Sequence, residues 1–172
     1  RGIAAAAFVA ALAGGCDRPP DEVWLRFLGF GADAASITLV EGKLRDGTTN
    51  GADALFENAS ASVGTTGGGT GVFIDRARVE YRMSGFAPPA FEYPVSLYLP
   101  APGDAASKGT LKNLPLAPVG LKRWLIDTGA FADATTVPSL ALQARVSFFA
   151  VTDEGLRLET GGGISVVLAN AQ

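Results

Sequence analysis

The sequence predicts an all-β protein, an antiparallel β-sandwich of about nine short strands. Several segments alternate apolar and polar residues with a period of two, as half-buried strands do. Gly, Pro, Asn and Asp cluster between these segments, where the chain has to turn. After the first sixteen residues no long segment carries apolar residues at helical spacing. Many short strands without intervening helices are typical of sandwiches and barrels, and we favour the sandwich.

Three segments show the clearest alternation: Phe73 to Met83, Phe91 to Leu99 and Leu140 to Val151. Pro94 falls on the outward series of the second segment and indicates an edge strand, because proline cannot donate to a ladder. The outward side of the first segment is charged and is interpreted as a solvated face, formed by Arg76, Arg78, Glu80 and Arg82. The inward residues predict the core, which includes Val79, Tyr81, Val95, Leu97, Leu142, Val146 and Phe148.

Shorter strands are expected at Val23 to Leu28, Ser36 to Val40, Leu111 to Leu116, Leu121 to Ile126, Leu156 to Glu159 and Ile164 to Leu168. Gly51 to Asn58 could supply a helical turn or two. Pro115-Leu-Ala-Pro118 is expected to bend the chain between two strands. The turns are expected at Asp46-Gly47, Asn50-Gly51, Ala87-Pro88-Pro89, Pro102-Gly103-Asp104, Asp153-Glu154-Gly155 and Gly161-Gly162-Gly163, the last two as hairpins.

The N-terminal residues indicate a secretory signal. Arg1 precedes the apolar run Ile3 to Leu12, which is too short to span a membrane, and small residues follow it. The string Leu12-Ala13-Gly14-Gly15-Cys16 resembles the lipobox of bacterial lipoproteins. This resemblance implies that Cys16, the only cysteine, is lipidated and becomes the mature N-terminus. A buried Ala-rich helix with an incidental cysteine and an uncleaved anchor are the alternatives.

Three parts follow from this interpretation: a signal peptide at residues 1–15, a lipidated tether at 16–22 and a single sandwich domain at 23–172, with the strands within 23–169. Acyl chains on Cys16 would hold the protein on a bacterial membrane, with the domain in the periplasm or at the cell surface. Asp17 resembles a sorting signal for the inner membrane, but such rules vary among bacteria. Both the outer and the inner membrane therefore remain alternatives for the location of the anchor.

Composition excludes several kinds of chemistry. The chain has no His, so a Ser-His-Asp or Cys-His arrangement and imidazole-bound zinc are impossible. With Cys16 lipidated, no thiolate is left to bind a metal or a haem, and we expect no metal and no cofactor. The net charge is −3 and no stripe of Lys and Arg is present, which argues against nucleic acid. Gly64 to Gly71 precedes a strand, so it lacks the context of a phosphate-binding loop.

Two pairs of acids could act together. Glu80 and Glu92 could lie on neighbouring strands as a carboxylate pair, and Asp153 with Glu154 could bind calcium at a loop tip. We interpret both pairs as surface charges. Exposed aromatic residues could stack on sugars or bind protein, although covering the core is the favoured interpretation; the candidates are Trp24, Trp124, Tyr98 and Phe149. Asn58-Ala59-Ser60 is a formal glycosylation sequon to which we assign no role.

A lipid signal, a short tether and one strand-rich domain together resemble the small cell-envelope lipoproteins of bacteria whose domain is similar to the immunoglobulin or fibronectin type III sandwich. The resemblance is best in Val79 to Arg82, Phe91 to Leu97 and Ala144 to Phe149, before the hairpin into Ile164 to Leu168. It implies an immunoglobulin-like fold and a noncatalytic binding or structural module for an envelope protein or a glycan. The alternative function is a carboxylate-based glycan hydrolase.

Overall fold

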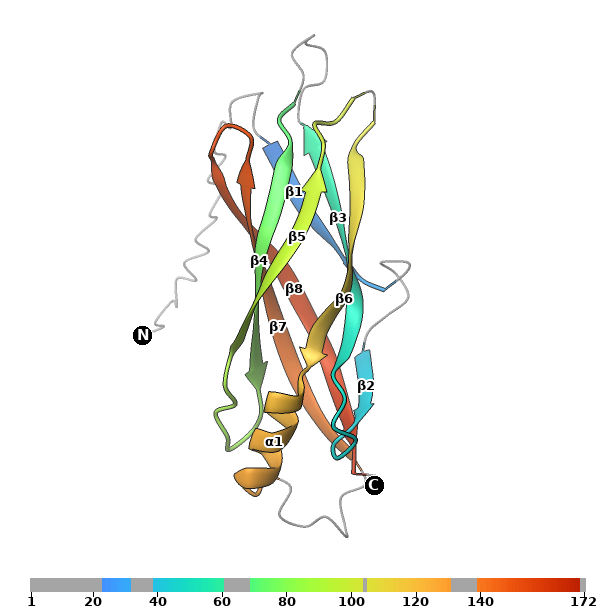
Figure 1. The fold of residues 1–172 in the computed structure, drawn as a ribbon, viewed down its shortest axis with the longest axis vertical. Coiled ribbons are helices and arrows are strands. Elements are labelled where there is room, and N and C mark those ends of the chain that lie inside the picture. The colour runs from blue at the N-terminus through green and yellow to red at the C-terminus, as the bar shows by residue number, and fades with distance from the viewer. Residues whose placement is uncertain (1–22, 32–38, 61–68, 104, 131–138, 171–172) are drawn as a thin grey trace, which may run out of the picture.

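The computed structural model describes residues 23–31, 39–60, 69–103, 105–130 and 139–170. These ranges contain eight strands and one helix, and the predicted all-β class is confirmed (Figure 1). In chain order the elements are β1 Val23–Phe30, β2 Leu39–Lys43, β3 Asn50–Ser60, β4 Val72–Arg82, β5 Phe91–Leu99, β6 Ser107–Ala117, α1 Val119–Asp127, β7 Ser139–Thr152 and β8 Arg157–Ala169.

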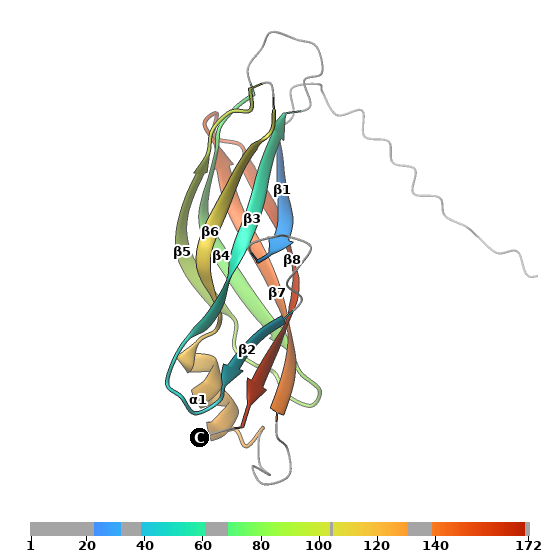
Figure 2. The ribbon, with the colours of Figure 1, turned by 90° about the vertical axis from the view of Figure 1, so that its right-hand side faces the viewer.

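The strands form two sheets that pack against each other (Figures 1 and 2). The smaller sheet has the order β1-β3-β6 and the larger has the order β2-β8-β7-β4-β5. All neighbouring strands are antiparallel except β2 and β8, which are parallel. The predicted antiparallel sandwich is therefore confirmed, with one parallel pair that the sequence did not indicate. This pair arises because the chain leaves the smaller sheet after β1 and joins the larger one as β2.

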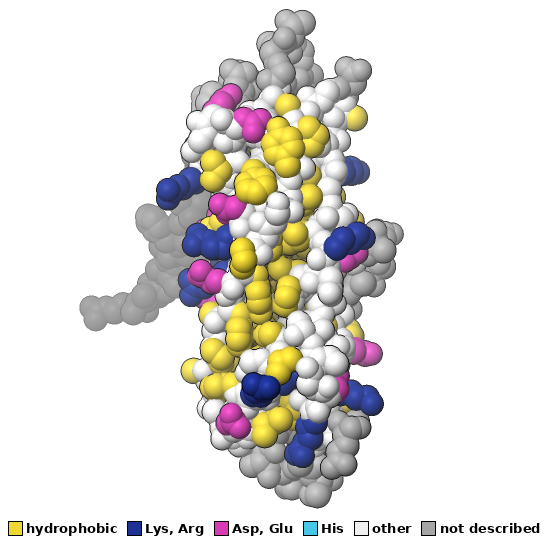
Figure 3. All heavy atoms as spheres, viewed as in Figure 1, with side chains coloured by type: hydrophobic (Ala, Val, Ile, Leu, Met, Phe, Trp, Pro, Cys, Tyr) yellow, Lys and Arg dark blue, Asp and Glu magenta, His cyan; other side chains and the backbone are white. Residues whose placement is uncertain are grey.

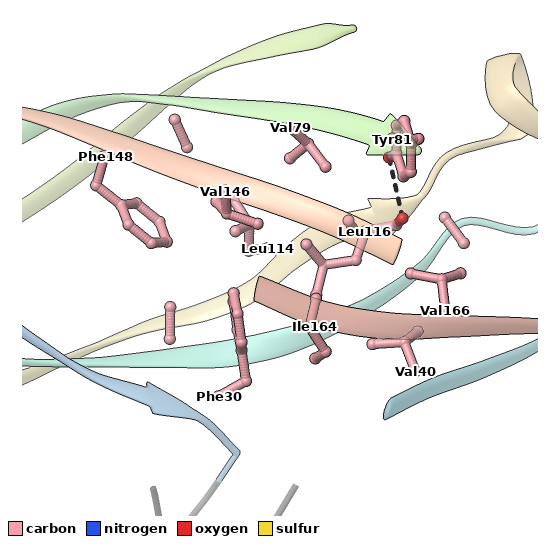
Figure 4. Packing of buried hydrophobic residues seen from close by; sticks show 14 of the residues in the cluster. Phe30, Val40, Val79, Tyr81, Leu114, Leu116, Val146, Phe148, Ile164 and Val166 are labelled. Atoms are coloured by element: carbon pink, nitrogen blue, oxygen red, sulfur yellow. Dashed lines mark hydrogen bonds between the residues drawn. The ribbon is translucent and has the colours of Figure 1, made fainter. Parts of the chain in front are cut away.

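The core lies between the two sheets and consists mainly of leucine, valine and alanine, with a small group of phenylalanine rings among them (Figure 4). The rings of Phe56 in β3 and Phe148 in β7 meet edge to face with their centroids 4.7 Å apart, and Phe27 packs against both. The Tyr81 hydroxyl donates a hydrogen bond of 3.0 Å to the Leu116 carbonyl oxygen, which satisfies a buried polar group between β4 and β6. Aromatic packing thus joins the two sheets around Phe148.

Most of the predicted core is confirmed. Five of the predicted residues are buried: Val79, Tyr81, Leu142, Val146 and Phe148. Val95 and Leu97 are only half-buried. They lie on β5, the last strand of the larger sheet, which confirms the edge position expected from Pro94. Inward side chains of an edge strand are covered on fewer sides than those of a central strand.

The helix α1 shows that the predicted strand at Leu121 to Ile126 is wrong. Pro118 takes an extended conformation at the N-cap, and the side chains of Leu121 and Leu125 are both buried in the core. Leu121, Trp124 and Leu125 have the i, i+3, i+4 spacing of a helix face, so the helical signal was present in a segment too short to be distinctive. Pro115 lies inside β6, and the Pro115 to Pro118 segment therefore joins a strand to a helix.

Two predicted turns and one predicted helical turn are also wrong. Gly161-Gly162-Gly163 lies inside the continuous strand β8, whereas a hairpin was expected there. Asn50-Gly51 and the following residues to Asn58 belong to β3, in which Ala54, Phe56 and Asn58 are buried at a period of two. The hairpin at Asp153-Glu154-Gly155 is confirmed, and the Thr152 amide donates to the Leu156 carbonyl oxygen at 2.9 Å.

A buried lysine holds α1 against the segment between β2 and β3. Lys122 is 2% exposed, and its Nζ donates to Asp46 Oδ1 at 2.7 Å and to Asn50 Oδ1 at 2.8 Å. An ammonium group buried without such partners would be costly. The hydrogen bond from Lys122, followed by that from the Thr48 amide, holds the pKa of Asp46 below its ordinary value.

This pairing predicts a loss of stability in acid. The pKa of Asp46 is lower in the folded protein than in the unfolded chain, where it is near 3.8. The ionised carboxylate therefore stabilises the fold fully at pH values above the unfolded pKa, and this stabilisation is lost as the pH falls toward the folded pKa. We expect Asp46→Asn to unfold at lower urea concentration than the natural protein at about pH 7, and the gap to narrow by about pH 2.5. Glu154→Gln, which removes an exposed acid with no ion pair among the described residues, should show no such pH-dependent gap.

Candidate functional site

The outer face of the larger sheet carries most of the candidate residues. Along β4 the outward side chains Arg76, Arg78, Glu80 and Arg82 are opposite Phe149, Ser147, Arg145 and Gln143 of β7. Those β7 residues are in turn opposite Glu159, Gly161, Gly163 and Ser165 of β8. This arrangement confirms the charged face expected for β4. It also places residues from three strands side by side that are far apart in the sequence.

Charges on this face are partly neutralised. Arg78 and Glu80 form an ion pair of 2.8 Å, and Arg76 lies 3.9 Å from Glu92 on β5. Glu80 and Glu92 therefore do lie on neighbouring strands, as expected, but each is paired with an arginine and about half exposed. Within the described ranges, Arg82, Arg145 and Arg157 make no ion pair. The unneutralised charge on the face is thus mainly positive.

Two hollows lie on this face. The larger, which we call the glycine hollow, has a volume of about 740 Å³ and is lined by Arg82, Gln143, Arg145, Ser147, Glu159 and the three glycines Gly161 to Gly163, among others. The smaller, the Phe149 hollow, has a volume of about 620 Å³ and includes Asp75, Arg76, Glu92, Phe149 and Arg157. The Arg76 guanidinium lies 4.2 Å from the centre of the Phe149 ring and covers it. The Phe149 ring is therefore not free to stack on a sugar.

Sequence reasoning missed the glycine hollow because the three glycines were interpreted as a turn. The alternation of β8 runs without a change of phase from Leu158 through Gly162 to Ile164, Val166 and Leu168. That constant phase on both sides of the glycines was the signal for a single strand. Arg145 falls on the outward series of the alternating segment Leu140 to Val151, but no local pattern places it near Arg82.

Asp153, in the turn between β7 and β8, holds neighbouring segments together through hydrogen bonds. Its Oδ2 accepts hydrogen bonds from the Gly71 amide at 3.0 Å and from the Tyr98 hydroxyl at 3.1 Å, and the bond to Asp153 raises the pKa of Tyr98. These bonds tie the β7–β8 turn to β4 and β5. Among the described residues no group of three or more acids is placed to hold a metal ion. Asp153 and Glu154 thus do not come together with further ligands.

The aromatic candidates separate in the fold. Tyr98 is 52% exposed at one end of β5, whereas Trp124 lies on α1 near the other end, where its ring meets Phe86 edge to face. The side chain of Trp24 is outside the described part of the structure. Figure 3 shows a hydrophobic stripe along the face where β5 and β6 lie. Tyr93 of β5 is half-buried, and burial raises its pKa to about 12. Tyr98 and Trp124 therefore do not share one surface.

Asn58 of the sequon is fully buried. Its Nδ2 donates hydrogen bonds of 3.0 Å to the carbonyl oxygens of Thr70 and Pro100. A glycan could not be attached to this nitrogen in the folded domain, since both of its donors are used and no solvent reaches it. The residue instead joins the end of β3 to the segments before β4 and after β5.

The predicted lipidation site, Cys16, lies outside the described residues, as do the signal peptide at 1–15 and the tether at 16–22. No helix in the described ranges has both the length and the apolar character needed to cross a membrane. No known protein-family model matches the chain, and a comparison with curated proteins finds no match.

Proposed function

We propose that this protein is a lipid-anchored module of the bacterial cell envelope that binds a protein or a glycan and has no catalytic activity. The lipobox-like string ending in Cys16 carries the proposal for the anchor. The strand that opens the domain begins at Val23, so the tether is seven residues long. An extended chain of that length reaches about 25 Å, which would keep the domain close to the membrane.

The strand order supports the resemblance to immunoglobulin and fibronectin type III domains. β1-β3-β6 and β4-β7-β8 correspond to the A-B-E and C-F-G strands of such sandwiches, with β2 and β5 as additional edge strands. Domains of this type commonly present loops, edges and faces to partners. Fold alone does not assign a partner, so the binding role has to be argued from a specific surface.

The anchor has a direct test. We expect the natural chain, expressed in a bacterium with a labelled fatty acid, to carry the label and to sediment with membranes, and Cys16→Ser to carry none and to accumulate as an uncleaved or released form. Gly15→Ala, which keeps a small residue beside the cysteine, serves as the matched control and should still be labelled. Label persisting on Cys16→Ser would exclude the proposed anchor.

The absence of catalysis is a separate prediction. Glu80 and Glu92, the best candidates for a carboxylate pair, are exposed and paired with arginines, whereas a general acid needs a raised pKa in a sheltered site. We expect no hydrolysis of a panel of envelope and plant glycans. Turnover that disappears in Glu80→Gln or Asp153→Asn would instead support the carboxylate-based hydrolase.

A further inference from the structure

We propose that the glycine hollow binds a linear glycan that carries carboxylate groups, an inference that rests on the proposed binding role and specifies its ligand. The hollow offers charged and polar groups in the mixture that sugars require. Arg82 and Arg145 are donors that no acid of the described chain neutralises, and Gln143 and Ser147, on either side of Arg145 along β7, also line the hollow. Glu159 adds an acceptor for hydroxyl groups.

Packing explains why two of the three glycines have no side chain, but it does not explain the third. A Cβ on Gly161 would collide with the Val146 carbonyl oxygen on β7, and a Cβ on Gly162 would lie 2.7 Å from the Phe27 ring in the core. A Cβ on Gly163 would meet only the Ala144 carbonyl oxygen at 3.7 Å, an ordinary contact. Folding therefore does not require a glycine at position 163. The effect of Gly163 is to keep the hollow open.

Charge favours an anionic ligand. Arg82 and Arg145 contribute two positive charges to the lining of the hollow, against the single negative charge of Glu159. A guanidinium group can bind a carboxylate through two parallel hydrogen bonds, which lysine cannot do. A sugar acid in every unit of a chain would present such carboxylates at regular intervals along the hollow.

The backbone favours a glycan over an acidic peptide. Peptides that bind sheets gain most of their affinity by pairing with a free strand edge. Between Gln143 and Ser147, β7 is already paired with β4 on one side and β8 on the other. The floor of the hollow therefore offers side-chain donors and acceptors but no strand edge on β7.

The experiment is a calorimetric titration of the full chain in detergent with oligogalacturonate, in which each sugar carries one carboxylate. We expect saturable binding that weakens with salt, and a loss of about tenfold or more in affinity for Arg82→Gln and for Arg145→Gln. Gly163→Gln should fill the hollow and abolish binding while the melting temperature stays unchanged. Arg123→Gln on α1 removes the same charge from an exposed residue that does not line the hollow and should bind as the natural chain does.

Three results would overturn the proposal: no saturable binding, an equal loss in Arg123→Gln, or unchanged binding in Gly163→Gln. Polyglutamate that binds as tightly and depends on Arg82 and Arg145 would replace the glycan with an acidic protein segment. The proposed anchor fails separately, if the natural chain carries no fatty-acid label or if the label persists on Cys16→Ser. A failed titration of a chain that is still labelled removes the glycan alone.

Discussion

Phe148→Ala is expected to lower the free energy of unfolding by about 3–5 kcal/mol. Phe148 is fully buried at the centre of the core, between the rings of Phe27 and Phe56. Its loss would leave a cavity where the two sheets meet and would remove two aromatic contacts, each of which adds about 0.5–1.5 kcal/mol. Urea unfolding followed by tryptophan fluorescence would measure the change.

Phe149→Ala is the matched control, because Phe149 is the next residue of the same strand and points to the outer face. Its main described contact is with the Arg76 guanidinium, and its loss is expected to cost about 1 kcal/mol. Equal decreases in the free energy of unfolding of the two variants would mean that the alternation of inward and outward side chains along β7 is not as described. A Phe148→Ala loss below that of Phe149→Ala would place the core elsewhere.

Gly161→Ala is expected to be the second strongly destabilising change, with a loss of about 1–3 kcal/mol. The added Cβ would collide with the Val146 carbonyl oxygen of β7, which is main chain and cannot rotate away. The neighbouring strands β7 and β8 would have to move apart, and the effect should appear as a lower melting temperature.

Gly163→Ala tests whether the effect is local to one glycine. Both residues lie on the outer side of β8, and both substitutions reduce the freedom of the unfolded chain equally. The Cβ on Gly163 has room, so Gly163→Ala should change stability by no more than about 0.5 kcal/mol. If both variants melted like the natural protein, the close approach of β7 and β8 at Gly161 would be refuted.

The long strands could be predicted because their signal is local and repeated. In β4 and β7 the alternation extends over most of the strand, and the residues that it assigned to the core, such as Val79 and Val146, are buried. The helix α1 was missed because nine residues contain too few turns for its spacing to stand out against a strand. Pro94 identified an edge strand, since a missing amide hydrogen has a direct consequence for pairing.

The sequence by itself determined the β class, the inward side of each long strand and the lack of any histidine chemistry, because each of these follows from single residues or their immediate neighbours. Tertiary structure alone decided which strands became neighbours, and therefore that Arg82, Arg145 and Gly163 surround one hollow. It also decided that Lys122 would be buried against Asp46 and Asn50. Strand pairing joins residues that are distant in the chain, and the free energy that selects one register comes from packing of the whole core, which no local pattern records.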